Sequence, residues 1–276
     1  MTREIKKPIL ITFDGEARTG KGTIVQATKD FLRDELGYKV MLIDRGQTFR
    51  VLVVAATRAG ANLDDPTAID AFLEDKQNVA ACVQFVKDVY HMEKSERDNL
   101  LYTNQVGESS AKVGARPASQ KFVANLTKKW LHDAGIEDFE VVLVDGRALE
   151  NIAQEMEAEG LCDYRAGLYF ICEEYIGARR TLGYAATKYE DLSPSQRVEV
   201  EDLVAQIKAR NQRDFERDVE PLIRPNAPTI VLPSAIDPEI IQQPSGRYVA
   251  IIDTSADMTK RVMCAPVLKL MRAVFS

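Results

Sequence analysis

The chain has 276 residues, long enough to bury a substantial core, and its 45% hydrophobic and 28% charged residues are ordinary for a globular protein. It contains no run of eighteen apolar residues and no signal-peptide pattern at its charged start, so we expect a cytoplasmic protein without a membrane span. The net charge of −6 argues against a general nucleic-acid-binding surface, because phosphate backbones favour a basic excess.

The first 44 residues predict a strand, a loop, a helix and a second strand. Residues 8–13 form a compact apolar run, which is typical of a strand buried on both faces of a parallel sheet. Apolar residues recur at helical spacing over 22–36, and Gly37 is placed to end this helix. Residues 39–43 form the next strand and complete a βαβ unit.

Three later apolar runs, at 141–144, 168–171 and 249–252, also read as sheet strands. Helical patterns lie between them. This alternation predicts a doubly wound α/β fold, in which functional residues gather at the carboxyl ends of the strands.

Three segments depart from this alternation and read as insertions. The segment 59–115 is polar and helical in pattern, and 180–212 contains Ser193-Pro194-Ser195-Gln196, which has the form of a capping box. The segment 224–247 carries five of the eleven prolines, and we expect an extended excursion on the surface.

The cysteines and histidines show no pattern of a metal or redox site. None of the four cysteines lies in a CxxC pair, and His91 and His132 stand alone in charged surroundings. We therefore expect reduced, mostly buried thiols and two surface histidines. The cysteines are Cys82, Cys162, Cys172 and Cys264.

The strongest functional signal is a glycine-rich loop with the spacing Gly-x4-Gly-Lys between the first strand and the first helix. Glycines let backbone N–H groups curl around phosphate oxygens, and the helix N-terminus adds its positive end. Lys21 would reach the β- and γ-phosphates of a nucleotide, and Thr23 would act near Mg²⁺. The loop reads Gly15-Glu16-Ala17-Arg18-Thr19-Gly20-Lys21-Gly22-Thr23.

A charged stripe continues the apolar face of a later helix. The apolar residues are Val200, Leu203, Val204 and Ile207, and the charged ones are Arg210, Asp214 and Arg217. Charges that extend a buried face indicate a cleft, although a ladder of helical salt bridges would give the same spacing. Converging arginines suit phosphoryl transfer, which moves a highly charged group.

Six segments, in order along the chain, resemble the bacterial cytidylate kinases, a family of nucleoside monophosphate kinases. Thr23 stands one place after the usual position of the phosphate-loop hydroxyl, as in the Gly-Lys-Gly-Thr form of these kinases. The six segments are 11–23 with the phosphate loop; Asp44-Arg45-Gly46-Gln47-Thr48-Phe49-Arg50; Asp145-Gly146-Arg147; Glu173-Glu174 with Arg179-Arg180; 210–217 with Pro221-Leu222; and Ile252-Asp253-Thr254-Ser255.

The resemblance implies a P-loop NTPase-type fold, with a doubly wound parallel sheet in one kinase domain over 1–276. It further implies a helical acceptor-binding insertion at 59–115 and a lid at 180–212, with 224–247 as a Pro-rich insertion. The implied reaction transfers a phosphoryl group from ATP, with Mg²⁺, to CMP or dCMP. We expect a monomer whose partner is this small nucleotide, without nucleic-acid or membrane partners.

The resemblance also assigns roles to individual residues. The residues that would bind ATP are Gly15, Gly20, Lys21, Gly22 and Thr23. The residues that would bind the metal are Thr23 and Asp145. The residues that would bind the acceptor are Asp44, Arg50, Asp145, Arg147, Arg210, Asp214 and Arg217. The catalytic set is Lys21, Arg179, Arg180, Arg210 and Asp214.

Departures from the family pattern leave two alternatives open. Arg18 replaces a usual glycine of the phosphate loop, so its side chain must point outward or the loop geometry differs. Arg45, Gln120 and Ala148 stand at altered acceptor positions, several of which read the base in the family. The chain could therefore phosphorylate another nucleotide or a small phosphorylated metabolite, or bind a nucleotide as a sensor without transferring phosphate.

Overall fold

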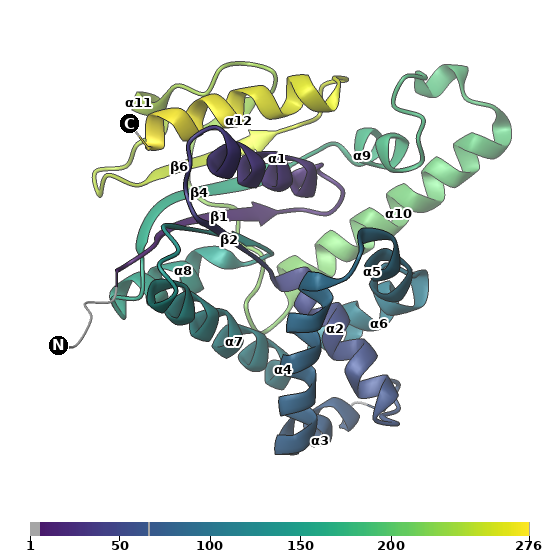
Figure 1. Ribbon diagram of the computed structural model, residues 1–276. Coiled ribbons are helices and arrows are strands. Elements are labelled where there is room, and N and C mark those ends of the chain that lie inside the picture. The colour runs from purple at the N-terminus through teal and green to yellow at the C-terminus, as the bar shows by residue number, and fades with distance from the viewer. Residues whose placement is uncertain (1–5, 66, 276) are drawn as a thin grey trace. The chain divides into compact units, whose positions relative to one another are not determined.

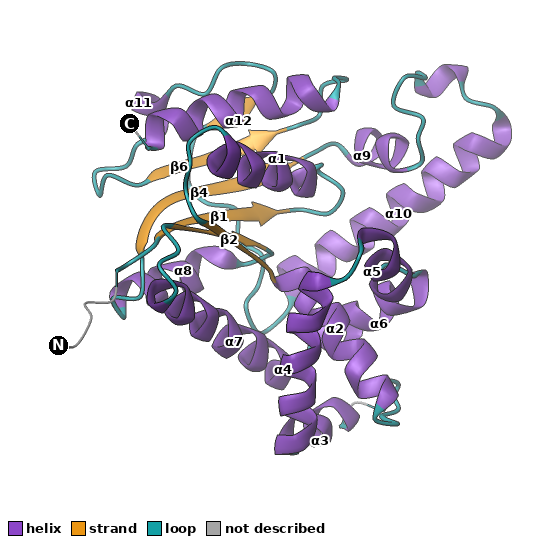
Figure 2. Ribbon diagram, in the orientation of Figure 1, coloured by secondary structure: helices purple, strands orange, loops and turns teal. Residues whose placement is uncertain are grey.

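The computed structural model describes residues 6–65 and 67–275, apart from the side chain of Asn104. By its internal contacts the chain divides into two compact units. The first comprises 1–43, 131–217 and 221–276, and the second comprises 44–130 and 218–220. Figures 1 and 2 show the elements of both units.

The first unit is built on a sheet of six strands in the order β2-β3-β1-β4-β6-β5. The pairings of β1 with β3 and β4, and of β6 with β4 and β5, are all parallel. The five predicted strands are confirmed as β1 (Ile9–Gly15), β2 (Val40–Asp44), β3 (Val141–Asp145), β4 (Asp163–Ile171) and β6 (Tyr248–Asp253). The α/β fold class is therefore confirmed.

Helices cover both faces of this sheet. On one face α1 (Lys21–Asp34) packs against α12 (Lys260–Val274), while α8 (Leu149–Ala158) contacts β1 and β4 on the other (Figure 1). The first helix ends near the predicted place, and Gly37 takes a φ of 76°, a left-handed conformation that glycine adopts without strain.

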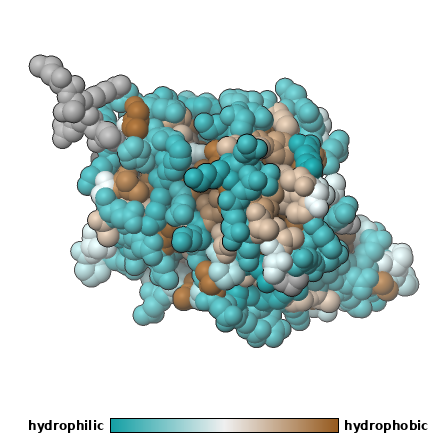
Figure 3. Space-filling view, turned by 90° about the horizontal axis from the view of Figure 1, so that it is seen from below, coloured by the Kyte–Doolittle hydropathy of each residue, from teal (hydrophilic) through white to brown (hydrophobic). Residues whose placement is uncertain are grey.

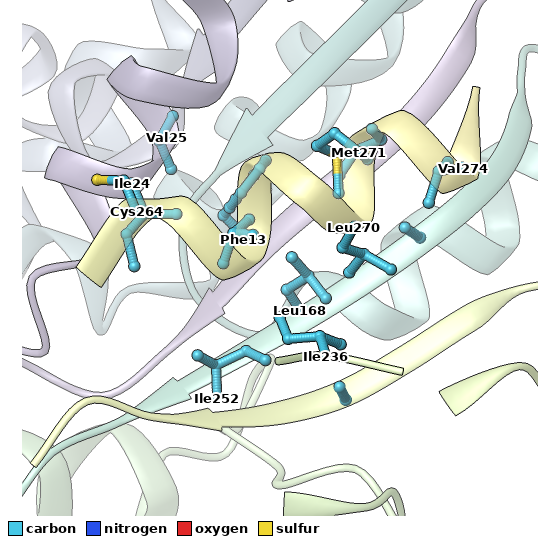
Figure 4. Close-up of a cluster of buried hydrophobic side chains, with 14 of the residues drawn as sticks. Phe13, Ile24, Val25, Leu168, Ile236, Ile252, Cys264, Leu270, Met271 and Val274 are labelled. Carbon is cyan, nitrogen blue, oxygen red and sulfur yellow. The ribbon is translucent and has the colours of Figure 1, made fainter. Parts of the chain in front are cut away.

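The main core lies between the sheet and the pair α1 and α12. Phe13 and Leu168 come from the sheet, and Ile24, Leu270 and Met271 from the two helices (Figure 4). Each of these side chains is no more than 1% exposed. Burial of a large aliphatic or aromatic side chain stabilises the fold by about 1.5–3 kcal/mol, so this layer stabilises the packing of α1 and α12 on the sheet.

The segment after β4 forms two helices joined by a loop. These are α9 (Glu174–Thr181) and α10 (Pro194–Glu216), with the short η1 (Tyr189–Asp191) between them. The predicted capping box is confirmed, since the Ser193 hydroxyl accepts from Gln196 N and the Gln196 side chain accepts from Ser193 N. An apolar cluster joins Ala178 of α9 to Val200, Val204 and Ile207 of α10.

The Pro-rich segment 224–247 is more than a surface excursion. It supplies β5 (Thr229–Val231), the edge strand that pairs with β6, and the short α11 (Pro238–Ile241). Leu232, Ile236 and Ile241 are buried in the main core. The five prolines conceal this packing, because they interrupt the periodicity by which a strand is recognised.

The second unit is helical and has its own core. It contains α2 (Arg45–Arg58), α3 (Ala68–Glu74), α4 (Lys76–His91), α5 (Lys94–Leu101) and α6 (Asn104–Gly114), and the first part of α7 (Pro117–Ile136). Apolar residues of α2 and α4, such as Leu52, Cys82 and Val86, fill its centre.

The cysteines and the histidines lie where the sequence predicts them. All four cysteines are buried and unbonded to one another, and both histidines are exposed. One face of the molecule is mainly hydrophilic, with hydrophobic residues in small groups (Figure 3). Over the described ranges, no helix combines the length and the apolar character that a membrane crossing requires.

Candidate active site

The glycine-rich loop connects β1 to the N-terminus of α1, as the sequence predicts. Gly15 has a φ of 131°, and a Cβ at this position would lie 2.2 Å from the backbone oxygen of Phe170 in β4. Only glycine allows this approach, which lets Glu16 N donate to the same oxygen at 2.9 Å. Arg18 is exposed, so its side chain points outward. Its φ of 59° is strained for a residue other than glycine.

Two hydrogen bonds from distant parts of the chain hold the loop. Ala17 N donates to the Asn211 side-chain oxygen of α10 at 2.9 Å. On the other side of the loop, the hydroxyl of Thr254, which follows β6, donates to Thr19 O at 2.7 Å. Asn211 and Thr254 are both buried, and although both lie in segments that resemble the family, the sequence predicts no individual role in the site for either.

Lys21, the first residue of α1, points its ammonium group at the loop that follows β3. It pairs with the Asp145 carboxylate and donates to Gly146 O at 2.7 Å and to Phe13 O at 3.2 Å. Lys21 and Asp145 are both partly exposed, with side-chain exposures of 14% and 17%. The predicted lysine and aspartate are therefore in direct contact at the carboxyl edge of the sheet.

The start of α1 is suited to an anion. Among the described residues no side chain caps this N-terminus, and its first turn contains no acidic residue. A Cβ added to Gly22 would meet nothing within 4 Å, so this part of the backbone is open to a bound group. Uncapped N–H groups and the positive end of the helix, together with Lys21, fit the phosphates of a nucleotide.

A magnesium ion also fits the residues at this edge. No cluster of three or more histidine, cysteine, aspartate or glutamate residues that could hold a metal occurs within residues 6–65 and 67–275. Mg²⁺ is usually held by one or two carboxylates together with substrate phosphates and water, so it needs no such cluster. Asp145 and the half-buried Thr23 are suitable oxygen donors of this kind.

A second group of charged residues lies on the loop that follows β3 and on α10. Arg147 pairs with Asp214, and Arg217 lies 3.6 Å from the same carboxylate. All three side chains are only 12–18% exposed. Burial lowers the pKa of Arg147 to about 10, while the nearby charge of Asp14 acts in the opposite direction. The loss of hydration that lowers this pKa also strengthens the attraction of the arginine for an anion.

Arg210 differs from the other members of the predicted stripe. It is exposed on α10, whereas Asn211 occupies the buried line that runs through Val200, Val204 and Ile207. A helix turns about 100° per residue, so the fourth residue after Ile207 returns within about 40° of it, and the third only within about 60°. The interpretation that Arg210 continues the buried face is therefore wrong, while Asp214 and Arg217 remain partly buried.

Arg179 and Arg180 of α9 both contact the loop that follows β6. Arg179 is buried and binds both carboxylate oxygens of Asp257, at 2.8 and 2.9 Å, and donates to Thr187 O. Arg180 donates to the backbone oxygens of Thr254, at 2.7 Å, and Ala256. In this structure the two arginines hold α9 to that loop.

The remaining predicted residues belong to the second unit. Asp44 caps α2 by accepting from Gln47 N at 2.8 Å. Arg50 donates to Leu101 O at 3.0 Å and lies 4.7 Å from the centre of the Tyr102 ring. Arg45, at one of the altered positions, is 2% exposed and pairs with Glu220 at 2.8 Å.

The parallel sheet, the glycine loop before α1 and the lysine it presents define an α/β protein of the P-loop NTPase type. No protein-family model matches the chain. Three curated proteins that do match the chain are cytidylate kinases.

The cytidylate kinase of Pseudomonas putida strain W619 is 27% identical over 227 residues, which cover 82% of this chain and 88% of that protein. That of Shewanella loihica is 25% identical over 78% of this chain and 82% of its own. That of Pasteurella multocida is 26% identical over 82% and 88%. The chain is therefore similar to bacterial cytidylate kinases over about four fifths of its length, which confirms the resemblance seen in its motifs.

Proposed function

We propose that the protein phosphorylates a nucleoside monophosphate with ATP, and that CMP or dCMP is its acceptor. The observation that carries this proposal is the contact of Lys21 with Asp145 beside an uncapped helix N-terminus. Similarity to cytidylate kinases over about four fifths of the chain supports the same reaction class. The identities of 25–28% leave the base and the sugar as the finer part of the proposal.

The phosphate loop would bind the donor. Backbone N–H groups between Gly15 and Gly22 would surround the phosphates, and Lys21 would exchange Asp145 for phosphate oxygens. Thr23 and Asp145 would hold Mg²⁺. When bound, ATP would supply the phosphoryl group, and the metal would offset its negative charge.

Arg147 and Arg217 would bind the acceptor phosphate, and Asp44, Arg50, Arg210 and Asp214 would complete the acceptor-binding set. A guanidinium group binds phosphate through two parallel hydrogen bonds, and Asp214 would orient the two arginines. No general base is required, because an oxygen of the acceptor monophosphate is already anionic. Catalysis would depend on alignment and on positive charge around the transferred group.

Arg179, directly before the lid at 180–212, and Arg180, its first residue, would act on the phosphates of ATP. A closed lid excludes water, which otherwise competes with the acceptor for the phosphoryl group. Both arginines hold the loop after β6 in this structure, so this role requires them to exchange those partners for phosphate oxygens.

A different acceptor is the second candidate, and Arg45 is the observation that favours it. A buried arginine paired with Glu220 stands where the family has a small hydroxyl residue. Its size and its charge differ from those of a hydroxyl, so the group recognised near α2 need not be cytosine. The acceptor would then be another nucleotide or a small phosphorylated metabolite.

A panel assay tests both candidates. The protein with Mg²⁺ and ATP is given CMP, dCMP, UMP, AMP and GMP in turn, and formation of ADP is followed. We expect turnover with CMP or dCMP, and a loss of kcat/KM of about 100-fold or more in Lys21→Ala. Lys29→Ala, on the same helix but away from the loop, is the matched control and should keep its activity.

The other outcomes are equally informative. Turnover with a different monophosphate alone would replace the acceptor and keep the reaction class. ATP binding without turnover on any of these five monophosphates would overturn CMP and dCMP as acceptors, and would favour a small phosphorylated metabolite as acceptor or a nucleotide sensor.

A further inference from the structure

The phosphate loop contains a carboxylate, which is an unfavourable group in a site for anions. Glu16 directly follows Gly15 and is only 7% exposed. A negative charge at this position repels the phosphates of a nucleotide, and the repulsion is strongest where water is excluded. The loop therefore needs a compensating cation if it is to bind phosphate well.

That cation comes from the Pro-rich segment. The Arg224 Nε donates to the Glu16 carboxylate at 2.8 Å, and its Nη2 donates to the same oxygen. The guanidinium carbon lies 5.9 Å from the centre of the Phe215 ring on α10. Although Arg224 is half exposed, its partner is buried, so the removal of the arginine leaves a buried charge without its counter-ion.

The segment on both sides of Arg224 is anchored in the first unit. Before it, the buried Leu222 donates its backbone N–H to Asp214 O at 2.7 Å. After it, β5 pairs with β6 and Leu232 is fully buried. These anchors fix the backbone of 222–232 against the sheet, so that Arg224 is held within reach of Glu16.

We propose that Arg224 is a positioning residue of the phosphate loop, which neutralises Glu16 and thereby allows the loop to bind nucleotide phosphates. The inference rests on the proposed function, since it assumes that the loop binds ATP. It assigns a role to the start of the 224–247 segment, which the motifs of the kinase family leave unexplained. Arg224 acts through Glu16 and does not itself touch the nucleotide.

A double-mutant cycle tests the proposal. The affinity for ATP with Mg²⁺ is measured by calorimetry for the full chain and for Arg224→Gln, Glu16→Gln and the double variant. We expect Arg224→Gln to weaken binding about 10-fold, Glu16→Gln to bind like the wild type, and the double variant to recover most of the loss. Arg224→Lys keeps the charge and should retain most of the affinity.

Ionic strength provides a readout that a merely structural role would not change. The loss in Arg224→Gln should be larger at 50 mM than at 500 mM salt, because salt screens the repulsion between Glu16 and phosphate. Arg272→Gln removes another arginine–glutamate pair, Arg272 with Glu35 at 2.7 Å on the surface, and should leave ATP binding unchanged.

Three results would overturn the inference, and they can be told apart. Wild-type affinity in Arg224→Gln, or a double variant as weak as Arg224→Gln, contradicts the role of Arg224 but leaves the proposed function intact. The absence of ATP binding by the wild-type protein itself overturns both. Thermal unfolding of each variant shows whether a loss of binding comes from a loss of fold.

Discussion

At the scale of single residues, Asn211 links the glycine-rich loop to α10. Its side-chain oxygen accepts from Ala17 N at 2.9 Å, and it is 7% exposed. Asn211→Ala leaves this N–H without an acceptor, which should lower the free energy of unfolding by about 1–3 kcal/mol. The freed loop should also bind ATP more weakly.

Gln212→Ala, at the exposed neighbouring position, is the matched control. Urea unfolding and ATP calorimetry of both variants measure the two effects. Equal behaviour of the two variants would show that the bond to Ala17 contributes neither to stability nor to nucleotide binding.

At the scale of elements, the N-terminus of α10 depends on its capping box. Ser193→Ala removes the acceptor for Gln196 N, and we expect a loss of about 1 kcal/mol in the free energy of unfolding. Ser193→Asp keeps an acceptor at the cap and should stay close to the wild type. Chemical denaturation of the two variants measures the difference.

The same pair of variants tests how far the helix start matters to the proposed lid. Because Ser193 lies far along α10 from Asn211 and Asp214, we expect ATP affinity to be unchanged in Ser193→Ala. A large change in affinity with intact stability would show that the start of α10, besides Arg179 and Arg180, affects nucleotide binding.

At the scale of the whole molecule, buried thiols make stability depend on pH. Burial raises the pKa of Cys82 from 9.0 to about 12. In the unfolded chain the thiol loses its proton near pH 9, while the folded protein keeps it, so the free energy of unfolding falls as the pH rises from about 9 towards 12. Between pH 8 and pH 10 this thiol should cost about 1.4 kcal/mol of stability.

Urea unfolding of the wild type and of Cys82→Ala at both pH values measures this contribution. The variant is expected to be less stable at each pH, because it leaves a cavity, but its loss between the two should be smaller by about 1.4 kcal/mol. Parallel losses in the two proteins would mean that the Cys82 thiol ionises as readily when folded as when unfolded.

The sequence is informative where a local pattern has one physical solution. The five apolar runs read as strands because strands of a parallel sheet are buried on both faces, and each of them is a strand of the sheet. The capping box at Ser193 and the glycine loop before α1 are equally local, and both are present. β5 was missed, since its short run at 229–231 lies between prolines.

The residues of the site divide in the same way, into those that a local pattern predicts and those that it does not. The sequence by itself determined the place of the glycine-rich loop and of Lys21 at the start of α1, because both follow from spacing within one βα unit. Only the tertiary structure decided that Asn211 rather than Arg210 faces the loop, and that Arg224 meets Glu16 from 208 residues away. Such contacts depend on how distant segments pack against one sheet, and no local periodicity encodes that.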